Sequence, residues 1–363
     1  MTDSSFKLLL NAAATAIGTL QMKAMRIHKL GPLSPGNPPL VEDDVPVPVP
    51  GPSELLVKVH ACGVCHTEID EIEGRTPPAT LPMIPGHQVV GTAVSEGSGC
   101  RRGLLNQRVG IAWIHSACGE CRWCLQGREN LCPRFSACGR DAAGGYAEYT
   151  VVPEAFAHLL PTGLGDQETT PLLCAGAVGY RALSLCKLEN GQALGLTGFG
   201  ASGHLVLQMA KHLYPDSPVF VFARSEKERA FASELGAAWT GDTTDRVVSG
   251  LDAIIDTTPA WLPVLSAMEA LAPGGRLVIN AIRKEVADHE ILASLDYERH
   301  LWREKSLSTV ANVTRHDVRE CLNLAAEIPL EPHVSTFPLE SANDALLELK
   351  QGDIRGARVL SIS

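Results

Sequence analysis

The sequence lacks an apolar segment long enough to cross a membrane, because no stretch reaches the roughly 18 apolar residues that a spanning helix needs. It also lacks a basic excess. Lys and Arg number 31 against 41 Asp and Glu, a formal net charge of −10, and no long basic run occurs. These two shortages argue against a membrane surface and against nucleic acid as partners.

The number of cysteines is not even, as complete disulfide pairing would require. The chain has 363 residues and 11 cysteines, an odd number that does not suit a secreted module held together by disulfides. Four of the cysteines lie within residues 118–132, which indicates metal binding rather than redox chemistry. We therefore expect an intracellular, cytoplasmic protein that carries a metal.

The amino terminus only loosely resembles a secretory signal. Lys7 precedes the apolar run LLLNAAATAIGTL, but Asp3 lies in the segment that should be basic, and polar residues interrupt the run. Residues 1–21 are therefore expected to be an N-terminal extension, and a first strand is expected to begin at Met22.

The length and the change of pattern along the chain predict two domains, because single cores seldom grow beyond about 250–300 residues. Short strands broken by Gly and Pro indicate an irregular β domain over residues 22–175. Strands then alternate with helices over 176–310, as in a doubly wound parallel sheet. The apolar strand ARVLSIS near the end matches the first part, so residues 311–363 are expected to return to the β domain.

A dinucleotide-binding signature opens the α/β segment. Gly198, Gly200 and Gly203 form G-x-G-x-x-G between a predicted strand and a predicted helix, where the backbone can approach a pyrophosphate. The next predicted strand ends at Ala223 without the acidic residue that binds a ribose 2′-hydroxyl, and Arg224 follows. This favours NADP over NAD, although Arg224 could instead be a solvated residue at a helix start.

The four clustered cysteines have a spacing typical of a closed metal site. Cys118, Cys121, Cys124 and Cys132 form C-x2-C-x2-C-x7-C, and four thiolates can surround zinc with no position left for a substrate. This predicts a structural zinc. An iron–sulfur cluster or four unliganded thiols are the alternatives.

Candidates for a catalytic zinc, which needs three ligands and an open position, are dispersed. They are Cys62 and Cys65 in ACGVCHTEID, His87 in PGHQVVG and Cys174 in LLCAGAVGYRAL. Taken singly, each cysteine could be an ordinary buried residue, and His87 could cap a turn.

Taken together, the motifs resemble the zinc-dependent medium-chain alcohol dehydrogenases from about Met22 to the end of the chain. G-V-C-H-T, G-H-x-x-x-G, the four-cysteine segment, L-C-A-G and G-x-G-x-x-G all occur in the family's order. The resemblance implies a GroES-like β domain with an inserted Rossmann domain. It also implies a homo-oligomer that acts on a small alcohol or aldehyde.

The resemblance also assigns roles to residues. Cys65, His87 and Cys174 become the catalytic zinc ligands, and Glu68 becomes the carboxylate that orients the histidine. Thr67 matches the hydroxyl that bonds the substrate oxygen. His66 matches a position at the cofactor pyrophosphate, and Trp113 matches one that lines the substrate cleft, with an ordinary core residue as the alternative for Trp113. Arg358, near the carboxyl end, could reach the cofactor phosphates or could be a solvated residue beside a strand.

Two positions depart from the family pattern. Gln88 stands where Glu often follows the ligand histidine, which puts the rate of ligand exchange at the metal in doubt. Asp70 stands where a proton relay often ends in histidine. It is either the relay terminus or a plain surface residue.

The expected reaction is reversible hydride transfer between an alcohol, expected to be primary, and NAD(P), with Thr67 passing the proton to cofactor hydroxyls, His66 or Asp70. Two alternatives stay open. One is a zinc-free quinone or enone reductase on the same scaffold, against which the complete ligand sets argue. The other is a zinc-ribbon module that binds nucleic acid, against which the negative charge argues.

Overall fold

The computed structural model describes residues 20–247, 250–328, 330, 332–352 and 356–362, so the proposed N-terminal extension lies almost wholly outside the described part. The chain forms two compact units, one of Met1–Leu173 with His333–Ser363 and one of Cys174–Pro332. The second unit is therefore inserted into the first. It ends later than residue 310, because helix α9 (Arg315–Glu327) packs against α5 (Ala175–Cys186) of the same unit.

The first unit is built on a seven-stranded sheet with the order β16-β17-β3-β4-β5-β9, in which β8 also pairs with β3. Strand β17 near the carboxyl end pairs antiparallel with β3, so both ends of the chain supply this sheet. The sheet strands are β3 (Glu54–Val64), β4 (Val89–Glu96), β5 (Arg108–Ile111), β8 (Tyr149–Pro153), β9 (Ala157–Leu159), β16 (Val334–Pro338) and β17 (Ala357–Ser361).

Smaller elements complete the first unit. Two short strand pairs, β1 with β2 and β6 with β7, lie outside the large sheet. Helix α2 follows β3 after a single residue, and α10 packs against α2, β3 and β17. The bounds are β1 (Gln21–Ile27), β2 (Leu40–Pro46), β6 (Ile114–Ser116), β7 (Ser136–Ala137), α2 (His66–Ile72), α3 (Arg122–Leu125), α4 (Asp166–Thr169) and α10 (Ala342–Gln351).

The second unit contains a parallel sheet of six strands in the order β12-β11-β10-β13-β14-β15. Of these six strands, β10 comes first along the chain and lies in the middle of the sheet. The winding direction therefore reverses between β10 and β13. Ligands of such sheets bind at this reversal, beyond the carboxyl ends of the strands. The strands are β10 (Leu194–Thr197), β11 (Val219–Phe222), β12 (Trp239–Gly241), β13 (Leu251–Asp256), β14 (Leu271–Ile279) and β15 (Ser306–Thr309).

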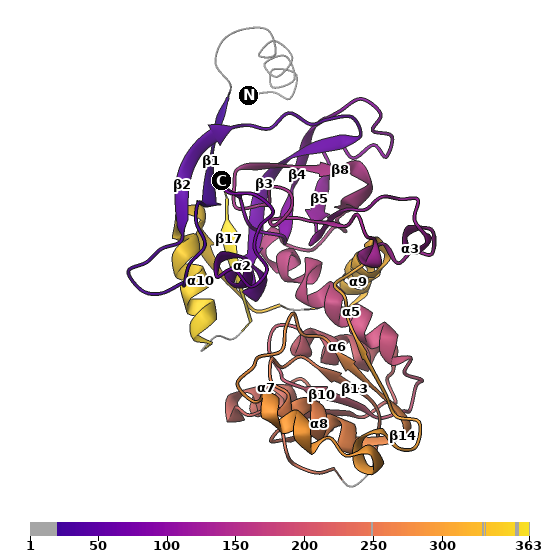
Figure 1. Ribbon diagram of the computed structural model, residues 1–363. Helices are drawn as coiled ribbons and strands as arrows, with labels where there is room; N and C mark the ends of the chain where they lie inside the picture. Colours follow the sequence, from indigo (N-terminus) through magenta and orange to yellow (C-terminus); the bar gives the residue numbers. More distant parts are fainter. Residues whose placement is uncertain (1–19, 248–249, 329, 331, 353–355, 363) are drawn as a thin grey trace. The chain divides into compact units, whose positions relative to one another are not determined.

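Helices cover both faces of this sheet. In Figure 1, α6 (Gly203–Leu213) and α8 (Leu262–Ala270) lie on opposite sides of the strands labelled β10 and β13. Helix α7 (Glu226–Glu234) contacts β11 and β12. Buried side chains of α8 form one core cluster with apolar residues of β13 and β14. The predicted doubly wound sheet is confirmed.

The glycine turn that the sequence predicts after α8 lies within β14. The register between β13 and β14 shifts between Leu251 and Ala253, which accommodates the segment around Gly274, whose φ is +76°.

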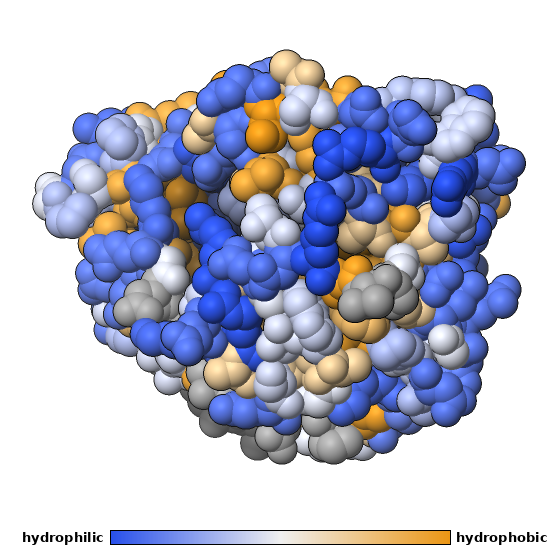
Figure 2. Space-filling view, turned by 90° about the horizontal axis from the view of Figure 1, so that it is seen from below, coloured by the Kyte–Doolittle hydropathy of each residue, from blue (hydrophilic) through white to orange (hydrophobic). Residues whose placement is uncertain are grey.

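No helix in the described residues is both long and apolar enough to span a bilayer. Hydrophilic side chains cover most of the face drawn in Figure 2, and hydrophobic ones interrupt them in smaller groups.

Candidate active site

The site begins where strand β3 passes into helix α2. Cys65 lies between them in an extended conformation and is the N-cap of the helix. Its backbone N–H donates to Oε2 of Glu68 at 2.8 Å. The other carboxylate oxygen of Glu68 lies 2.5 Å from Nδ1 of His87, and both side chains are buried. One carboxylate therefore fixes the helix start and the imidazole ring together.

The structure brings together the three residues assigned to a catalytic metal. The ligand atoms of Cys65, His87 and Cys174 all lie within 4.8 Å of one another. Cys174 is the N-cap of α5, and the peptide bond joins it directly to Leu173, the last residue of that part of the first unit. Two thiols and one imidazole form a set that suits zinc and leaves a fourth position for a substrate.

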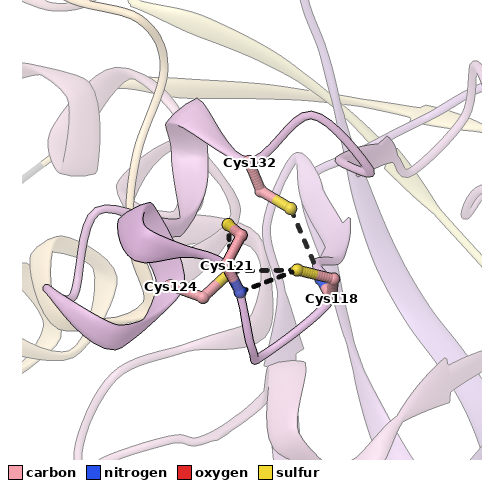
Figure 3. Close-up of side chains that lie close together, drawn as sticks. All are labelled: Cys118, Cys121, Cys124 and Cys132. Carbon is pink, nitrogen blue, oxygen red and sulfur yellow. Dashed lines mark hydrogen bonds between the residues drawn. The ribbon is translucent and has the colours of Figure 1, made fainter.

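The four-cysteine segment also closes on itself. The sulfur atoms of Cys118, Cys121, Cys124 and Cys132 lie within 4.8 Å of one another and point toward a common centre (Figure 3). Backbone N–H groups point at them as well, with that of Cys121 3.3 Å from the Cys118 sulfur and that of Arg134 3.3 Å from the Cys132 sulfur. Four sulfur ligands with N–H donors around them fit a closed, structural zinc site.

The thiols of this segment are electrostatically unequal. Backbone N–H groups of Glu120 and Cys121 lower the pKa of Cys118 to about 6, because they stabilise its thiolate. Burial raises the pKa of Cys124 to about 12. A bound cation favours the thiolate form at every such ligand.

The glycine turn has the geometry that a dinucleotide needs. Gly198 has φ +81°, and a Cβ there would lie 2.6 Å from Oγ1 of Thr257. A Cβ on Gly203 would lie 2.8 Å from the carbonyl oxygen of Gly198, so close packing requires glycine at both positions. A Cβ on Gly200, in contrast, would meet no atom of the described residues within 4 Å. That side of the turn is open at the start of α6, where a helix favours an anion.

Comparisons with known proteins agree with this geometry. The family model of the alcohol dehydrogenase GroES-like domain matches residues 51–162, and that of the zinc-binding dehydrogenase matches residues 201–327. A probable alcohol dehydrogenase, AdhA, of Mycobacterium tuberculosis (strain CDC 1551 / Oshkosh) is 43% identical over 349 residues, which cover 95% of this chain and 98% of the relative. This chain belongs to the zinc-dependent medium-chain alcohol dehydrogenase family.

Further relatives extend the agreement. An alcohol dehydrogenase of Geobacillus stearothermophilus is 34% identical over 85% of this chain and 91% of the relative. Among solved structures, a zinc-binding dehydrogenase of Sinorhizobium meliloti 1021 bound to NADP has a TM-score of 0.81 at 26% identity, covering 94% of this chain and all of that one. A cobalt- and zinc-bound alcohol dehydrogenase of Pyrobaculum aerophilum has a TM-score of 0.82 at 24% identity, over 94% and 100% of the two chains, which shows a shared fold.

Family membership confirms the predicted fold, a GroES-like domain with an inserted Rossmann domain, and the predicted reaction class. The chain is a zinc-dependent oxidoreductase that acts on alcohols.

In this dehydrogenase His87, a predicted metal ligand, packs against groups that the sequence did not identify. It follows Gly86, whose φ is +100°. A Cβ on Gly86 would collide with the ring of Tyr146 and lie 2.9 Å from the Cys62 sulfur, and the Cys138 thiol donates to the Gly86 carbonyl at 3.5 Å. Cys62, which the resemblance leaves out of the ligand set, and Cys138 thus pack against the backbone that carries His87. The only signal in the sequence was the glycine before the histidine.

Burial and neighbouring charges shift the pKa values of His87 and of two carboxyl groups near it. Burial raises the pKa of Glu68, although His87 opposes this. Burial lowers the pKa of His87, but the charge of Glu68 and the hydrogen bonds with Cys65 and Glu68 outweigh burial and raise it well above its usual range. Glu71, one helical turn after Glu68, is 1% exposed, and burial and the charge of Glu68 raise its pKa well above its usual range.

The three predicted catalytic residues of helix α2 have different surroundings. The Thr67 hydroxyl is buried and lies 3.6 Å from the Cys65 sulfur, close to the ligand set. His66 is exposed. Asp70 is 1% exposed, so the alternative of a plain surface residue is wrong. Arg75 donates to its carboxylate through Nε at 2.6 Å and pairs through Nη2 at 2.5 Å, so a cation already occupies Oδ1 of Asp70.

Two residues expected near the substrate and the metal are packed against their own unit. Trp113 is half-buried, with its ring 4.8 Å from that of Phe135 and the guanidinium of Arg140 over it at 5.2 Å. Gln88 is 4% exposed, and its amide covers Gly63, where a Cβ would lie 2.6 Å from its oxygen.

The predicted cofactor-binding arginines lie in different units. Arg224 is exposed immediately after β11, and Arg229 of α7 donates to the carbonyls of Ala223 at 2.7 Å and of Arg224 at 2.9 Å. Arg358 is 9% exposed and donates to Glu348 at 3.0 Å.

The sheet also places Arg358 beside the start of helix α2, which a sequence pattern alone does not predict. It pairs in the sheet with Val64, the last residue of β3, two residues before His66. The two side chains predicted to lie near the cofactor phosphates, His66 and Arg358, therefore come from adjoining positions of one unit.

Proposed function

We propose that this chain oxidises primary alcohols, and reduces the corresponding aldehydes, with NADP preferred over NAD. In this proposal it holds two zinc ions, one at Cys65, His87 and Cys174 and one at the four clustered cysteines. The observation that carries the proposal is the convergence of the three dispersed ligand atoms within 4.8 Å. The complete set argues for the zinc enzyme over a zinc-free reductase on the same scaffold.

The residues around this set explain how a proton could leave the substrate. When bound, zinc supplies Lewis-acid activation of the alcohol, and NAD(P) supplies the hydride acceptor. Thr67, buried beside the Cys65 sulfur, is placed to accept a hydrogen bond from the substrate hydroxyl. The exposed His66 next to it can release the proton to solvent. Asp70 is left out of this relay because Arg75 holds its carboxylate.

The proposed function is tested by assaying a panel of primary and secondary alcohols with NAD and NADP in parallel, with zinc measured per chain. We expect primary alcohols to react faster and about two zinc ions to be present, as the two ligand sets predict. Activity in a protein that contains no zinc would overturn the proposal in favour of the zinc-free reductase.

The preference for NADP rests on Arg224, which is exposed at the end of β11 with no carboxylate at the position that binds a ribose 2′-hydroxyl. Arg224→Asp should weaken NADP at least tenfold, about 1.4 kcal/mol, and shift the ratio of kcat/KM values toward NAD. Arg319→Asp, an equal charge change on the exposed face of α9, is the control. An unchanged ratio in R224D would show that Arg224 is only a solvated residue.

We further propose that the chain forms a homo-oligomer through the edge of the Rossmann sheet. All four residues of β15 are exposed, and so are the nearby Tyr297 and Trp302. An open edge of this kind can pair with the same strand of a second copy. Leu307→Lys should lower the mass measured by sedimentation. A wild-type chain that sediments as a monomer would refute the proposal.

A further inference from the structure

A buried ion pair lies at the carboxyl end of the parallel sheet, beside the glycine turn. Asp256 is the last residue of β13 and is fully buried. Its register partner on β10 is Thr197, whose hydroxyl donates to Asp256 Oδ1 at 2.6 Å. Gly198 follows Thr197 directly. The carboxylate thus spans the two strands between which the winding direction reverses.

Lys284, in the loop after β14, neutralises this carboxylate. Its ammonium bonds Asp256 Oδ2 and also donates to the carbonyls of Thr258 at 2.8 Å and of Ala260 at 2.9 Å. An ammonium has three donors, and each of them has an acceptor here. A guanidinium could not reproduce three bonds that converge from one nitrogen atom.

The same loop is pinned to the segment after β13 by further bonds. The Glu285 N–H donates to the Pro259 carbonyl at 2.7 Å. The Asp288 carboxylate accepts the N–H groups of Trp261 at 2.7 Å and of Leu262 at 2.8 Å, at the start of α8. Because Lys284 reaches furthest toward the sheet, it is the anchor that connects this loop to the strand ends.

We propose that Lys284 is a positioning residue for the dinucleotide. This rests on the proposed use of NAD(P). A pyrophosphate that crosses the strand ends at the reversal point passes near Asp256, and an uncompensated carboxylate there repels it. Lys284 cancels that charge and fixes the loop of residues 280–288 beside the cofactor path.

The test compares Lys284→Met with a matched control, Lys305→Met. The Lys305 ammonium is also held by carbonyls, those of Met268 at 2.7 Å and of Arg299 at 3.0 Å, but it lies just before β15, at the opposite end of the strands. Both variants lose a held ammonium. Only K284M leaves a buried carboxylate near the cofactor path without its cation.

Dissociation constants for NAD and NADP, steady-state kinetics and thermal midpoints are measured for both variants. We expect K284M to weaken the preferred dinucleotide about tenfold or more and to raise its KM, with kcat at saturating cofactor changed less than about threefold. K305M should lower the thermal midpoint and leave the dissociation constant unchanged. Equal weakening in both variants would show a structural role only and overturn the proposal.

The double variant Asp256→Asn with Lys284→Met covers the case in which K284M folds poorly. It removes both charges, while the amide oxygen of Asn can still accept the hydroxyls of Thr197 and Thr258, which bond Asp256 at 2.6 and 2.8 Å. We expect it to regain at least half of the lost affinity on a logarithmic scale. A double variant that binds no better than K284M would contradict the charge argument. Failure of the wild-type chain to bind either dinucleotide would instead refute the proposed function.

Discussion

At the residue scale, Glu68 serves two partners with one carboxylate. Oε2 accepts the Cys65 N–H at 2.8 Å, and Oε1 lies 2.5 Å from His87 Nδ1. A glutamine has only one acceptor oxygen, so Glu68→Gln must break one of these bonds. We expect E68Q to lower kcat by about 10- to 100-fold, the usual cost of losing the carboxylate behind a ligand histidine. Steady-state kinetics together with zinc analysis check this.

Glu71→Gln is the matched control for that variant. Glu71 is also a buried carboxyl on α2, and burial raises its pKa well above its usual range, so an uncharged amide is a close substitute. Kinetics close to those of the wild type are expected. If E68Q and E71Q lower kcat equally, the loss reflects disturbance of the helix and not the orientation of His87.

At the element scale, side-chain hydrogen bonds hold helix α2 at its C-terminal end as well as at its start. Glu73 accepts hydrogen bonds from Lys350 of α10 at 2.6 Å, from Arg75 at 2.6 Å and from the Leu33 N–H at 3.0 Å. Burial raises the pKa of Glu73, but these bonds outweigh burial and lower it to about 2. The pKa of Glu73 in the unfolded chain is near 4.5. The hydrogen bonds of Glu73 therefore stabilise the fold fully above about pH 4.5, and this contribution is lost as the pH falls toward 2.

Glu73→Gln should therefore cost about 1 to 2 kcal/mol at pH 7, the usual value for hydrogen bonds to a charged group, and less at pH 3.5. Urea unfolding of both proteins at the two pH values measures the difference. Glu320→Gln, which removes a surface pair with Arg319, should cost less than about 0.5 kcal/mol. A cost of E73Q that does not change with pH would contradict the shifted pKa.

The elements also show what a sequence pattern can predict. The alternation of strands with helices after residue 176 predicted the parallel sheet, because parallel strands need a crossover connection that is usually a helix. Helix α2 was not predicted as a helix, because its polar residues HTEIDEI have buried partners that only the fold supplies. The domain boundary at residue 310 preceded α9, because the packing of α9 on α5 is a tertiary contact. The ligand residues came from motif resemblance, whereas Tyr146 and the Lys284–Asp256 pair have no local signal.

At the scale of the whole molecule, the two cysteine sites should differ in what they support. The four thiols of residues 118–132 lie within one loop region, which has little core of its own, so a metal there contributes to folding. Cys174 lies at the N-cap of α5, whose buried residues hold it without a metal. Cys121→Ser should lower the free energy of unfolding by about 2 kcal/mol or more, and Cys174→Ser should lower it far less.

For compact units of this size, a cost of that order in C121S corresponds to a fall in thermal midpoint of about 4–8 °C. C174S should keep its midpoint within about 2 °C and lose alcohol oxidation by more than about a hundredfold, because a ligand of the site that activates the substrate is lost. Thermal unfolding, zinc content and turnover are measured on the same preparations. Each variant should retain about one zinc per chain. Equal loss of stability in the two variants would contradict the division into a structural and a catalytic site.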